Sequence, residues 1–313
     1  MQTEAVILKQ PGQLSLGSLD LTEVGAEDVV VEMRWSGISA GTEALLWSGD
    51  MPWFPGLEYP LVPGYEGVGD VVSGDAAGVV PKGTRVLVPG ANCYVGARGL
   101  FGATASRVVV PAKRVIPVER DLGVDAALLS LAATAHHAIA ASPHVEQTRV
   151  IGHGVVGRLI TRLLIARGDP APVVWETNAE RRSGTVGYEA LDPSDDPYAS
   201  HVTVFDASGD PNILDPAIAR LARGGEVVLA GFYAKPLSFS FPPAFMREAR
   251  FRVAAEWAAE DMAAVTALVA SGALDLSGLV TDTEPATEPD RAFQRAFFDP
   301  SCLKMTLDWS AVH

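Results

Sequence analysis

A glycine-rich turn at residues 152–157 constrains this chain more than any other segment. It has the spacing G-x-G-x-x-G, with its glycines at Gly152, Gly154 and Gly157. The apolar pair Val150-Ile151 precedes it, and apolar residues at steps of three and four follow it. A strand, a tight turn and a helix in this order can hold a dinucleotide pyrophosphate at the helix N-terminus. The first glycine permits the turn, the second lets the backbone approach the phosphates, and the third lets the helix pack on the strand.

An acidic residue follows at the distance that such a site requires. A second strand is predicted at residues 172–175, and it ends on Glu176, about 20 residues after the last glycine. A carboxylate there accepts hydrogen bonds from the ribose hydroxyls and repels a 2′-phosphate, which favours NAD over NADP. Arg181 and Arg182 would bind such a phosphate if their loop folds back. The alternative interpretation is an ordinary helix-capping turn with a solvated Glu176.

Composition and charge narrow the classes of function. The chain has 313 residues, enough for two domains, and its 24 basic and 38 acidic residues give a formal charge of −14. This balance argues against nucleic acid as a partner and against attraction to anionic lipid. Two cysteines, Cys93 and Cys302, cannot form a disulfide framework or a four-cysteine zinc site. Without a basic, apolar leader or a run of about 18 apolar residues, we expect a cytoplasmic protein with no transmembrane segment.

The pattern of the chain changes near residue 119. Before it, short apolar runs separated by Gly and Pro clusters predict a barrel-like or sandwich-like β domain. The predicted strands there are residues 29–33, 67–72, 85–88 and 106–110. An Ala- and Leu-rich helix is then predicted at residues 124–141, and Pro143 is expected to end it.

From residue 149 onward strands alternate with helices, which predicts a parallel sheet covered by helices on both faces. We predict a strand at residues 201–205, a helix at 213–221, a turn at Gly224-Gly225 and a strand at 226–230. The last part is predicted to hold two helices, a loop between them and a terminal strand; these are residues 261–271, 291–297, 281–289 and 303–309.

Five segments, in chain order, carry a resemblance to a known family. They are residues 36–43, 63–69, 134–138, 205–209 and 224–231. They resemble the S-G-I-C-G-T-D segment, the G-H-E-x-x-G segment, the T-A-Y-x-A turn and two further cofactor-domain segments of the medium-chain dehydrogenase/reductase superfamily. The resemblance implies an α/β fold, with a GroES-like β-barrel catalytic domain (residues 1–118 with 256–313) and a doubly wound Rossmann domain (residues 119–255). It also implies an active site in the cleft between them, and a homodimer formed through Rossmann edge strands.

Within that superfamily, the chain is most similar to a branch that acts on bacteriochlorophyllides. Residues 37–49, the aromatic run 52–55 and residues 60–66 carry this similarity. It implies oxidation of a 1-hydroxyethyl substituent on a chlorin ring to an acetyl group, with NAD as the hydride acceptor. The predicted cofactor contacts are the fingerprint, the acidic residue and two positions at the nicotinamide end; they are Gly152, Gly154, Val155, Val156, Gly157, Glu176, Thr134 and Gly231.

The metal ligands of the superfamily are missing from the matching segments. Zinc-dependent members use a Cys, a His and a Cys, Asp or Glu, and the corresponding places here hold Ser39 or Ala40, Tyr65 and Ser130. None of these is a ligand that zinc favours in proteins. The loop that binds structural zinc in the family retains only Cys93. The resemblance therefore implies that catalysis proceeds without zinc.

Histidines do not restore a metal site in the sequence. His136 and His137 are adjacent and are expected to point in different directions on a helix, and His153 lies within the fingerprint. The alternative metal site would use His136, Glu66 or Glu43.

Four residues are candidates for the proton chemistry of alcohol oxidation, which needs a base and a stabilised alkoxide. Tyr65 replaces the zinc-binding His, and a phenol with a lowered pKa would serve as base or hydrogen-bond partner. Thr42 keeps the hydroxyl beside the substrate oxygen, and Glu66, with Glu43, would orient these groups. His136 is the other titratable candidate. The alternatives are that Tyr65 fills space, Glu66 forms a structural ion pair, Thr42 is a turn residue and His136 packs.

Aromatic residues near these segments suggest a platform for a flat apolar ligand. The candidates for substrate contact are Trp47, Trp53 and Phe54, with Tyr59 nearby. Packing in the barrel core or at a dimer interface is the alternative. Two other functions stay open at this point: a zinc-independent quinone or enoyl reductase, and a dinucleotide-binding protein that has lost catalysis.

Overall fold

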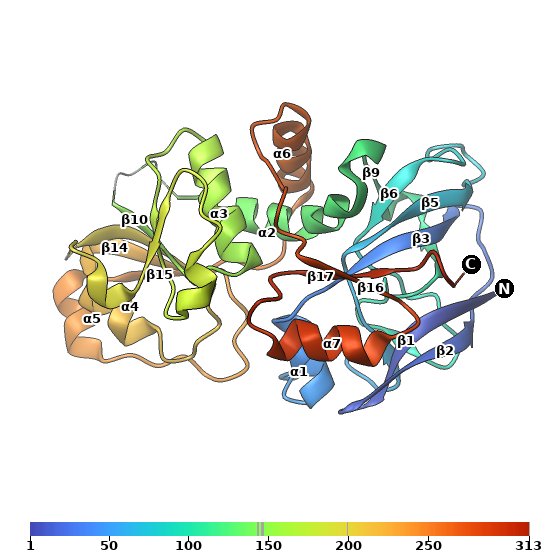
Figure 1. Cartoon of the computed structure of the whole chain (residues 1–313), viewed down its shortest axis with the longest axis horizontal. Coiled ribbons are helices and arrows are strands. Elements are labelled where there is room, and N and C mark those ends of the chain that lie inside the picture. Colours follow the sequence, from blue (N-terminus) through green and yellow to red (C-terminus); the bar gives the residue numbers. More distant parts are fainter. Residues whose placement is uncertain (143, 145–146, 199, 313) are drawn as a thin grey trace. The chain divides into compact units, whose positions relative to one another are not determined.

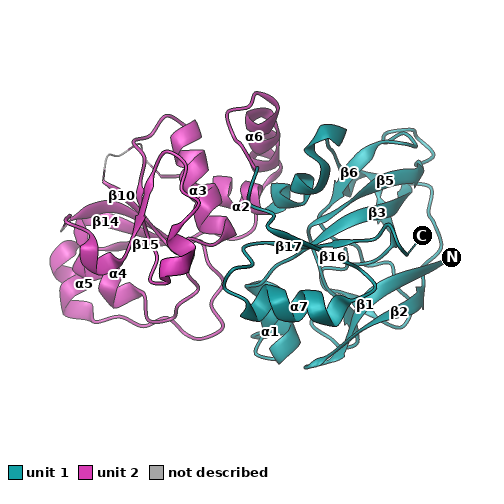
Figure 2. Ribbon diagram, viewed as in Figure 1, with its two compact units in different colours: residues 1–130, 277–313 teal, residues 131–276 magenta. Residues whose placement is uncertain are grey.

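The chain folds into two compact units. A computed structural model describes residues 1–142, 144, 147–198 and 200–312. Unit 1 comprises residues 1–130 and 277–313, and unit 2 comprises residues 131–276 (Figures 1 and 2). Unit 2 is thus an insertion in the sequence of unit 1. The domain boundaries expected from the sequence stay predictions, and Pro143, which was expected to end a helix, lies outside the described residues.

Unit 1 is built on two β-sheets. The smaller has the strand order β2-β1-β4-β7, and the larger has the order β16-β17-β3-β5-β6-β9 with β8 paired to β3. Their strands are Gln2–Gln10 (β1), Gln13–Asp20 (β2), Asp28–Ile38 (β3), Leu61–Val62 (β4), Gly67–Ser73 (β5), Arg85–Val88 (β6), Arg98–Gly99 (β7), Arg107–Pro111 (β8), Ile116–Pro117 (β9), Asp282–Pro285 (β16) and Met305–Asp308 (β17).

The long strand β3 is the centre of unit 1. It pairs antiparallel with β5, β8 and β17, so its backbone is hydrogen-bonded along both edges. Val29, Val31 and Met33 on it are fully buried, as expected for β-branched and apolar residues in the middle of a sheet. The strand ends at Ile38, which places Ser39 and helix α1 (Thr42–Ser48) directly after it.

Helix α7 (Pro289–Phe298) contacts β16, β17 and β2 in unit 1. Its proline stands in the first turn, where the missing N–H costs no hydrogen bond. The 3₁₀-helix Ala112–Arg114 (η1) joins β8 to β9, and the 3₁₀-helix Arg120–Leu128 (η2) follows β9 toward the end of the first segment of unit 1.

Unit 2 contains a six-stranded sheet in the order β12-β11-β10-β13-β14-β15, and each neighbouring pair in it is parallel. The strands are Thr148–Ile151 (β10), Val173–Trp175 (β11), Glu189–Leu191 (β12), His201–Asp206 (β13), Leu221–Leu229 (β14) and Arg250–Val253 (β15). Three helices connect these strands, Val155–Ala166 (α3), Leu214–Ala219 (α4) and Phe241–Arg247 (α5), with Ala179–Arg182 (η3) and Pro193–Asp195 (η4) as short 3₁₀ turns. Leu129–Ala140 (α2) precedes the first strand, and Ala259–Ala270 (α6) follows the last.

Helices pack on both faces of this sheet. Val204 and Val227 cluster with Ile218 of α4 on one face. Their neighbours Phe205 and Val228 are also buried, and alternate residues of a strand point to opposite faces. Helix α3 contacts β10 and β13. The arrangement confirms the predicted parallel sheet with helices on both faces.

Two local predictions were wrong. Gly224-Gly225, predicted as a turn, lies inside β14, where the pairing with β13 jumps from His201↔Leu221 to Thr203↔Glu226. The intervening residues form an irregularity that Gly224, with φ 74°, permits. The predicted loop 281–289 contains β16, which pairs with β17 in parallel. Its Asp, Glu and Pro residues have low strand propensity, and only Thr283 favours a strand, so the pairing with β17 overrides the local preference.

One helical run, Arg120–Ala140, is long and apolar enough by composition to cross a bilayer. Of its most apolar window, 61% is buried inside the protein. A core helix can have the same length and apolar composition as a membrane span, so this run is weak evidence for one.

Candidate functional site

The glycine turn in unit 2 has the geometry that its sequence requires. Gly152 follows β10 with φ 91°, a left-handed conformation that favours glycine. A Cβ on Gly157 would lie 1.9 Å from the carbonyl oxygen of Gly152, so only glycine lets α3 pack this closely on the turn. Gly154 is the N-cap of α3, and Val155 and Val156 form its first turn. The first N–H groups of the helix are therefore directed to where a pyrophosphate would bind.

This turn lies at the switch point of the sheet. From β10 the chain runs outward through β11 and β12, and then returns to continue on the other side of β10 with β13. Ligands of open parallel sheets bind at the carboxyl ends of the strands beside such a reversal. Glu176 follows β11 and Gly231 follows β14, so both lie at that edge. The predicted contact Thr134 lies on α2, partly exposed.

The Glu176 carboxylate is held by two backbone N–H groups. Its Oε2 accepts a hydrogen bond from the N–H of His153 at 3.1 Å, and its Oε1 accepts one from Asn178 at 2.8 Å. The acidic residue is thus tied directly to the glycine turn. These glycine and carboxylate positions fit a dinucleotide.

In unit 1, the three residues at the positions of the family's zinc ligands, Ser39, Tyr65 and Ser130, are joined by hydrogen bonds between neutral groups. The Tyr65 hydroxyl donates to Ser39 Oγ at 2.6 Å, and the Ser130 hydroxyl donates to the Tyr65 carbonyl oxygen at 3.0 Å. Hydroxyls and a carbonyl do not match the thiolate, imidazole and carboxylate donors of zinc sites. Among the described residues, no group of three or more His, Cys, Asp or Glu side chains is placed to hold a metal ion. The residues present therefore do not fit a catalytic zinc.

Tyr65 corrects one expectation from the sequence. Its phenol was expected to have a lowered pKa, but burial raises the pKa well above its ordinary value, and the nearby Glu66 raises it further. Hydrogen bonds with Ser39 and Thr42 act in the opposite direction and are too weak to offset these effects. At neutral pH the Tyr65 hydroxyl keeps its proton and acts as a hydrogen-bond donor. Burial, which set the sign of the shift, is not visible in the local sequence.

Beside Tyr65 lies a buried cluster of two carboxyls and one ammonium, Glu43, Glu66 and Lys304. Lys304 Nζ forms an ion pair with Glu66 Oε2 and donates to the Ile38 carbonyl at 3.0 Å. This contact corresponds to the structural ion pair that the sequence left open as the alternative role of Glu66. Burial raises the pKa of Glu66, and the contact with Lys304 opposes that rise.

Glu43 closes the loop between β3 and α1. Its Oε1 accepts from the Ser39 N–H at 3.2 Å, and its own N–H donates to the Ser39 carbonyl at 2.8 Å. Burial and the neighbouring Glu66 raise the pKa of Glu43 to about 8, against the opposing effects of the Ser39 N–H and Lys304. Thr42, the preceding residue, starts the same helix. Thr42, Tyr65 and Glu66 therefore belong to one connected region of unit 1.

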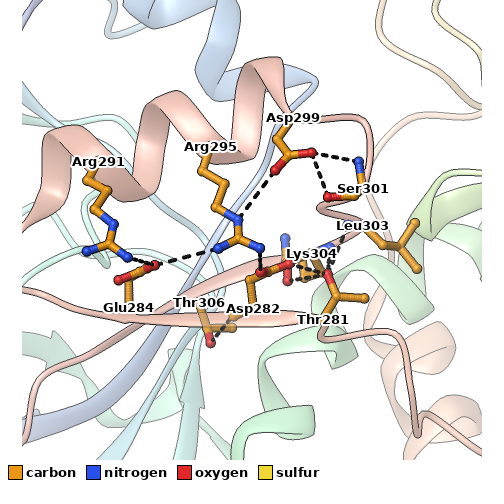
Figure 3. A network of polar contacts seen from close by, with 10 residues as sticks. All are labelled: Thr281, Asp282, Glu284, Arg291, Arg295, Asp299, Ser301, Leu303, Lys304 and Thr306. Atoms are coloured by element: carbon orange, nitrogen blue, oxygen red, sulfur yellow. Dashed lines mark hydrogen bonds and ion pairs between the residues drawn. The ribbon is translucent and has the colours of Figure 1, made fainter.

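The C-terminal segment of unit 1 fixes the backbone of Lys304. The hydroxyl of Thr281 accepts hydrogen bonds from the N–H groups of Leu303 and Lys304 at 2.9 and 3.3 Å. Figure 3 shows Arg295 of α7 bridging the carboxylates of Asp282 and Asp299 above the paired strands β16 and β17. The network holds β16, α7 and β17 together, and Lys304 extends from it into the buried cluster.

His136 lies in unit 2 and has a partner that the sequence did not reveal. His136 Nδ1 lies 2.8 Å from Asp261 Oδ1, and His137 Nδ1 lies 2.8 Å from Asp261 Oδ2. The expectation that the two histidines point in different directions was wrong, because one carboxylate reaches both rings. Asp261 also accepts from the Ala258 N–H at the start of α6. It is separated from His136 by 125 residues, so no local pattern connects them.

The predicted aromatic platform is divided in the structure. Trp47 packs against Phe297 and Phe298 of α7, whereas Trp53 is 87% exposed. Phe54 contacts Phe101 edge-on at 5.8 Å between ring centroids, and Phe101 contacts Tyr65 at 5.3 Å. Phe101 was missed, because it lies far in sequence from the segments that carry the motifs. Whether Trp47, Trp53 and Phe54 touch substrate stays a prediction.

Comparison with solved structures identifies the class of fold. An alcohol dehydrogenase from Escherichia coli in complex with NADH superposes with a TM-score of 0.84 at 20% identity, covering 98% of this chain and 99% of that one. A zinc-binding dehydrogenase from Sinorhizobium meliloti bound to NADP gives 0.82 at 19% identity, covering 99% and 100%. The family model of the alcohol dehydrogenase GroES-like domain matches residues 25–120. The fold is that of the medium-chain dehydrogenases/reductases, with a GroES-like and a Rossmann domain.

Two full-length relatives narrow the class to a family. The 2-desacetyl-2-hydroxyethyl bacteriochlorophyllide A dehydrogenase of Cereibacter sphaeroides is 52% identical over 316 residues, covering 99% of each chain. The protein of the same name from Rhodobacter capsulatus is 50% identical over 310 residues, again covering 99% of each. The chain belongs to this family of bacteriochlorophyllide dehydrogenases, and it is an oxidoreductase of the alcohol dehydrogenase type.

Proposed function

We propose that this protein oxidises the 3-(1-hydroxyethyl) group of a bacteriochlorophyllide a precursor to a 3-acetyl group, with NAD as the hydride acceptor and without a catalytic zinc. The observation that supports this choice of substrate is the 52% identity, over essentially the whole chain, with a relative named for a hydroxyethyl bacteriochlorophyllide. In this reaction the carbinol carbon gives up a hydride, the hydroxyl oxygen gives up a proton, and a carbon–oxygen double bond forms.

The proposed cofactor site is the glycine turn with its acidic partner. A bound nicotinamide dinucleotide supplies the acceptor for the hydride. The turn at Gly152 and the N-terminus of α3 would hold its pyrophosphate, and Glu176 would accept hydrogen bonds from its adenosine ribose. Thr134 and Gly231 are proposed for the nicotinamide end. The NADH and NADP in the two similar structures support a nicotinamide cofactor of either kind, and Glu176 favours NAD.

The proposed absence of zinc rests on the donor set at Ser39, Tyr65 and Ser130. Their hydroxyls are already engaged with one another and with a carbonyl. We infer that the hydroxyls of Tyr65 and Thr42 hydrogen-bond the substrate oxygen in place of a metal. A chlorin ring delocalises the positive character that develops as hydride leaves, so less electrostatic stabilisation is needed from the protein.

For the proton, the structure offers two acidic or basic groups with different surroundings. Glu43, with its pKa near 8, ionises in the range where a general base is effective. Its ionisation would make oxidation faster as the pH rises through about 8. His136 in unit 2 is oriented by Asp261 and stays a second candidate.

An absorbance assay tests the proposed reaction. Purified protein, treated exhaustively with chelator, is mixed with NAD and a hydroxyethyl bacteriochlorophyllide. We expect a red shift of the ring absorption, because the acetyl group conjugates with the macrocycle, together with formation of NADH. Activity that vanishes on chelation and returns with stoichiometric zinc would overturn the zinc-independent reaction. Reduction of a C=C bond with NADPH would instead support a reductase.

We also propose that the protein forms a homodimer through strand β15. This strand is the last in its sheet order, so one edge of its backbone has no strand partner in the described chain. Apolar side chains around it are exposed, among them Val253 at 73%, Phe245 at 65% and Met246 at 72%. Pairing of two copies at β15 would cover both features. Sedimentation of the wild type and of Val253→Lys tests this, with a monomeric wild type as the contrary result.

A further inference from the structure

His153, between the first two glycines of the fingerprint, joins the turn to the loop that follows Glu176. Its side chain is fully buried. Nδ1 lies 2.6 Å from the Arg181 carbonyl oxygen, and Nε2 lies 2.8 Å from the Tyr188 hydroxyl. The rings of His153 and Tyr188 also meet edge-on at 5.6 Å. The residue at a position expected only to line a phosphate loop therefore holds a second segment, residues 177–188.

The partners of His153 determine its tautomer. A carbonyl oxygen can only accept, so Nδ1 carries the hydrogen that bonds to Arg181. Nε2 of the neutral ring is then an acceptor, and the Tyr188 hydroxyl donates to it. Burial lowers the pKa of His153, which keeps the ring in this neutral form. The backbone N–H of the same residue donates to Glu176 Oε2, so one residue fixes both the carboxylate and the loop beyond it.

Arg158 of α3 reinforces the same connection. It donates to the carbonyl oxygens of His153 at 3.0 Å, Gly184 at 3.0 Å, Arg181 at 3.2 Å and Ser183 at 2.8 Å. A guanidinium has five N–H donors, and backbone carbonyls take most of them here. Arg158 is buried, so its charge is used to hold the loop against the glycine turn.

The arginine nearest to the Glu176 backbone is also engaged. Arg182 donates to the Glu176 carbonyl at 2.7 Å, to the Thr177 carbonyl at 3.0 Å and to Asp192 Oδ2 at 2.8 Å. A dinucleotide with a 2′-phosphate requires a cationic donor beside the ribose. In this loop conformation the carboxylate faces the ribose position, while Arg158 and Arg182 are held by carbonyls and by Asp192.

We propose that His153, Tyr188 and Arg158 form a latch that holds residues 177–188 on the fingerprint and thereby sets the preference for NAD over NADP. The inference rests on the proposed function, because it assigns positioning residues to the cofactor site named there. The three residues act through Glu176: with the latch closed, the carboxylate presents fixed acceptors to the ribose hydroxyls and repels a phosphate. With the latch open, Glu176 can turn away and both properties weaken.

The test measures binding of NAD and NADP to the full chain by calorimetry, without chlorin substrate. His153→Ala is expected to weaken NAD binding about tenfold and to leave NADP binding little changed, so that the preference falls about tenfold. Tyr188→Phe keeps the ring contact and removes the hydroxyl, and its preference is expected to fall a few-fold. Val186→Ala, an exposed position in the same loop, is the matched control and should keep the wild-type ratio.

Hydrogen exchange of the cofactor-free proteins gives a second readout. Amides of residues 177–188 are expected to exchange faster in both latch variants than in the wild type and the control. If the wild type prefers NAD and both latch variants keep that preference, with or without faster exchange, the latch does not set specificity and the inference is overturned. If the wild type itself prefers NADP, the proposed NAD dependence fails, whatever the variants do. The ratio of the two affinities separates specificity from a general loss of stability.

Discussion

Each unit of the protein buries a charged cluster, and the two clusters differ in how well their carboxylates are paired. In unit 2, Asp196 accepts from Arg149 Nε and Nη2 at 2.8 and 3.3 Å, from Trp175 Nε1 at 2.8 Å and from the Tyr198 N–H at 3.0 Å. In unit 1, Glu43 Oε2 and Glu66 Oε1 are buried without a hydrogen-bond partner. The Asp196 carboxylate thus has donors on both oxygens, whereas Glu43 and Glu66 each keep one oxygen without a donor.

The pKa values follow this difference in pairing. Burial alone would raise the pKa of Asp196, but the donors around it outweigh burial and lower the pKa to about 2. For Glu43 burial prevails and the pKa rises to about 8. A completely paired buried carboxylate serves the structure, whereas an under-paired one that titrates near neutral pH is typical of functional sites. The comparison therefore supports the proposed role of Glu43 as a base and a structural role for Asp196.

The largest expected effect comes from removing the Lys304 ammonium, which contacts Glu66. Lys304→Met should reduce the free energy of unfolding at pH 8 by about 3–5 kcal/mol, since it leaves a buried carboxylate without its counter-charge. Arg149→Met should cost less, because Asp196 keeps the N–H groups of Trp175 and Tyr198. Urea titrations of both variants measure this. An equal or larger loss of stability in Arg149→Met would contradict the comparison. The double variant Lys304→Met/Glu66→Gln should regain most of the stability that Lys304→Met loses.

The second prediction concerns stability in mildly alkaline solution. The folded-state pKa of Glu43 lies above its ordinary value of 4.5, so its contribution is complete below pH 4.5 and is lost as the pH rises through about 8. Between pH 5.5 and 8 the wild type should lose about 3 kcal/mol through this group. Glu43→Gln cannot ionise and should show a flatter profile in urea titrations over that range. Parallel profiles of the two proteins would contradict the assignment.

The third prediction concerns the loss of stability in acid through Asp196 of unit 2. The folded-state pKa of Asp196 lies below its ordinary value of 3.8, so its stabilisation is present above that pH and is lost as the pH falls through about 2. The loss amounts to about 2 kcal/mol. Asp196→Asn should be less stable than the wild type at pH 7 and should converge with it in acid. Thermal unfolding followed from pH 5 downward measures the difference, and a constant gap at all pH values would exclude this role.

The smallest expected effect on stability belongs to Tyr65→Phe. The ring keeps its contact with Phe101, and the hydrogen bonds of the hydroxyl with Ser39 and Thr42 are lost, so the free energy of unfolding should fall by about 1 kcal/mol. If the hydroxyl contacts the substrate oxygen, kcat for the chlorin alcohol should nevertheless fall about tenfold or more. Steady-state kinetics with the matched variant Tyr59→Phe separate the two effects. An unchanged kcat removes Tyr65 from the mechanism.

The cofactor half of the molecule was predictable because its requirements are local. Gly152 is needed for its left-handed φ of 91° and Gly157 for its close approach to the Gly152 carbonyl, both within one strand, turn and helix. Glu176 lies one helix and one strand further on. Hydrophobic period and glycine spacing record such requirements directly. The strand at Arg85–Val88 was predicted at its observed bounds for the same reason.

The polar cluster of unit 1 was predictable only in part. The resemblance placed Thr42, Tyr65 and Glu66 in one region, but Lys304 reaches Glu66 from the end of the chain, through a strand pairing between β3 and β17. The sign of the Tyr65 pKa depends on burial by segments distant in sequence, Phe101 among them. Likewise, the carboxylate between His136 and His137 comes from a helix that no local pattern ties to them. Long-range contacts of this kind leave no periodic pattern in the sequence from which they could be predicted.

The pairing of β17 with β3 also has a consequence for how the protein is made. On the ribosome β3 emerges early, but its edge partner Met305–Asp308 is translated after the whole of residues 131–276. The inserted unit can therefore acquire its native structure while the surrounding sheet still has an open edge. Until β17 arrives, that edge is exposed to pairing with other nascent chains, and chaperone demand should concentrate in this interval.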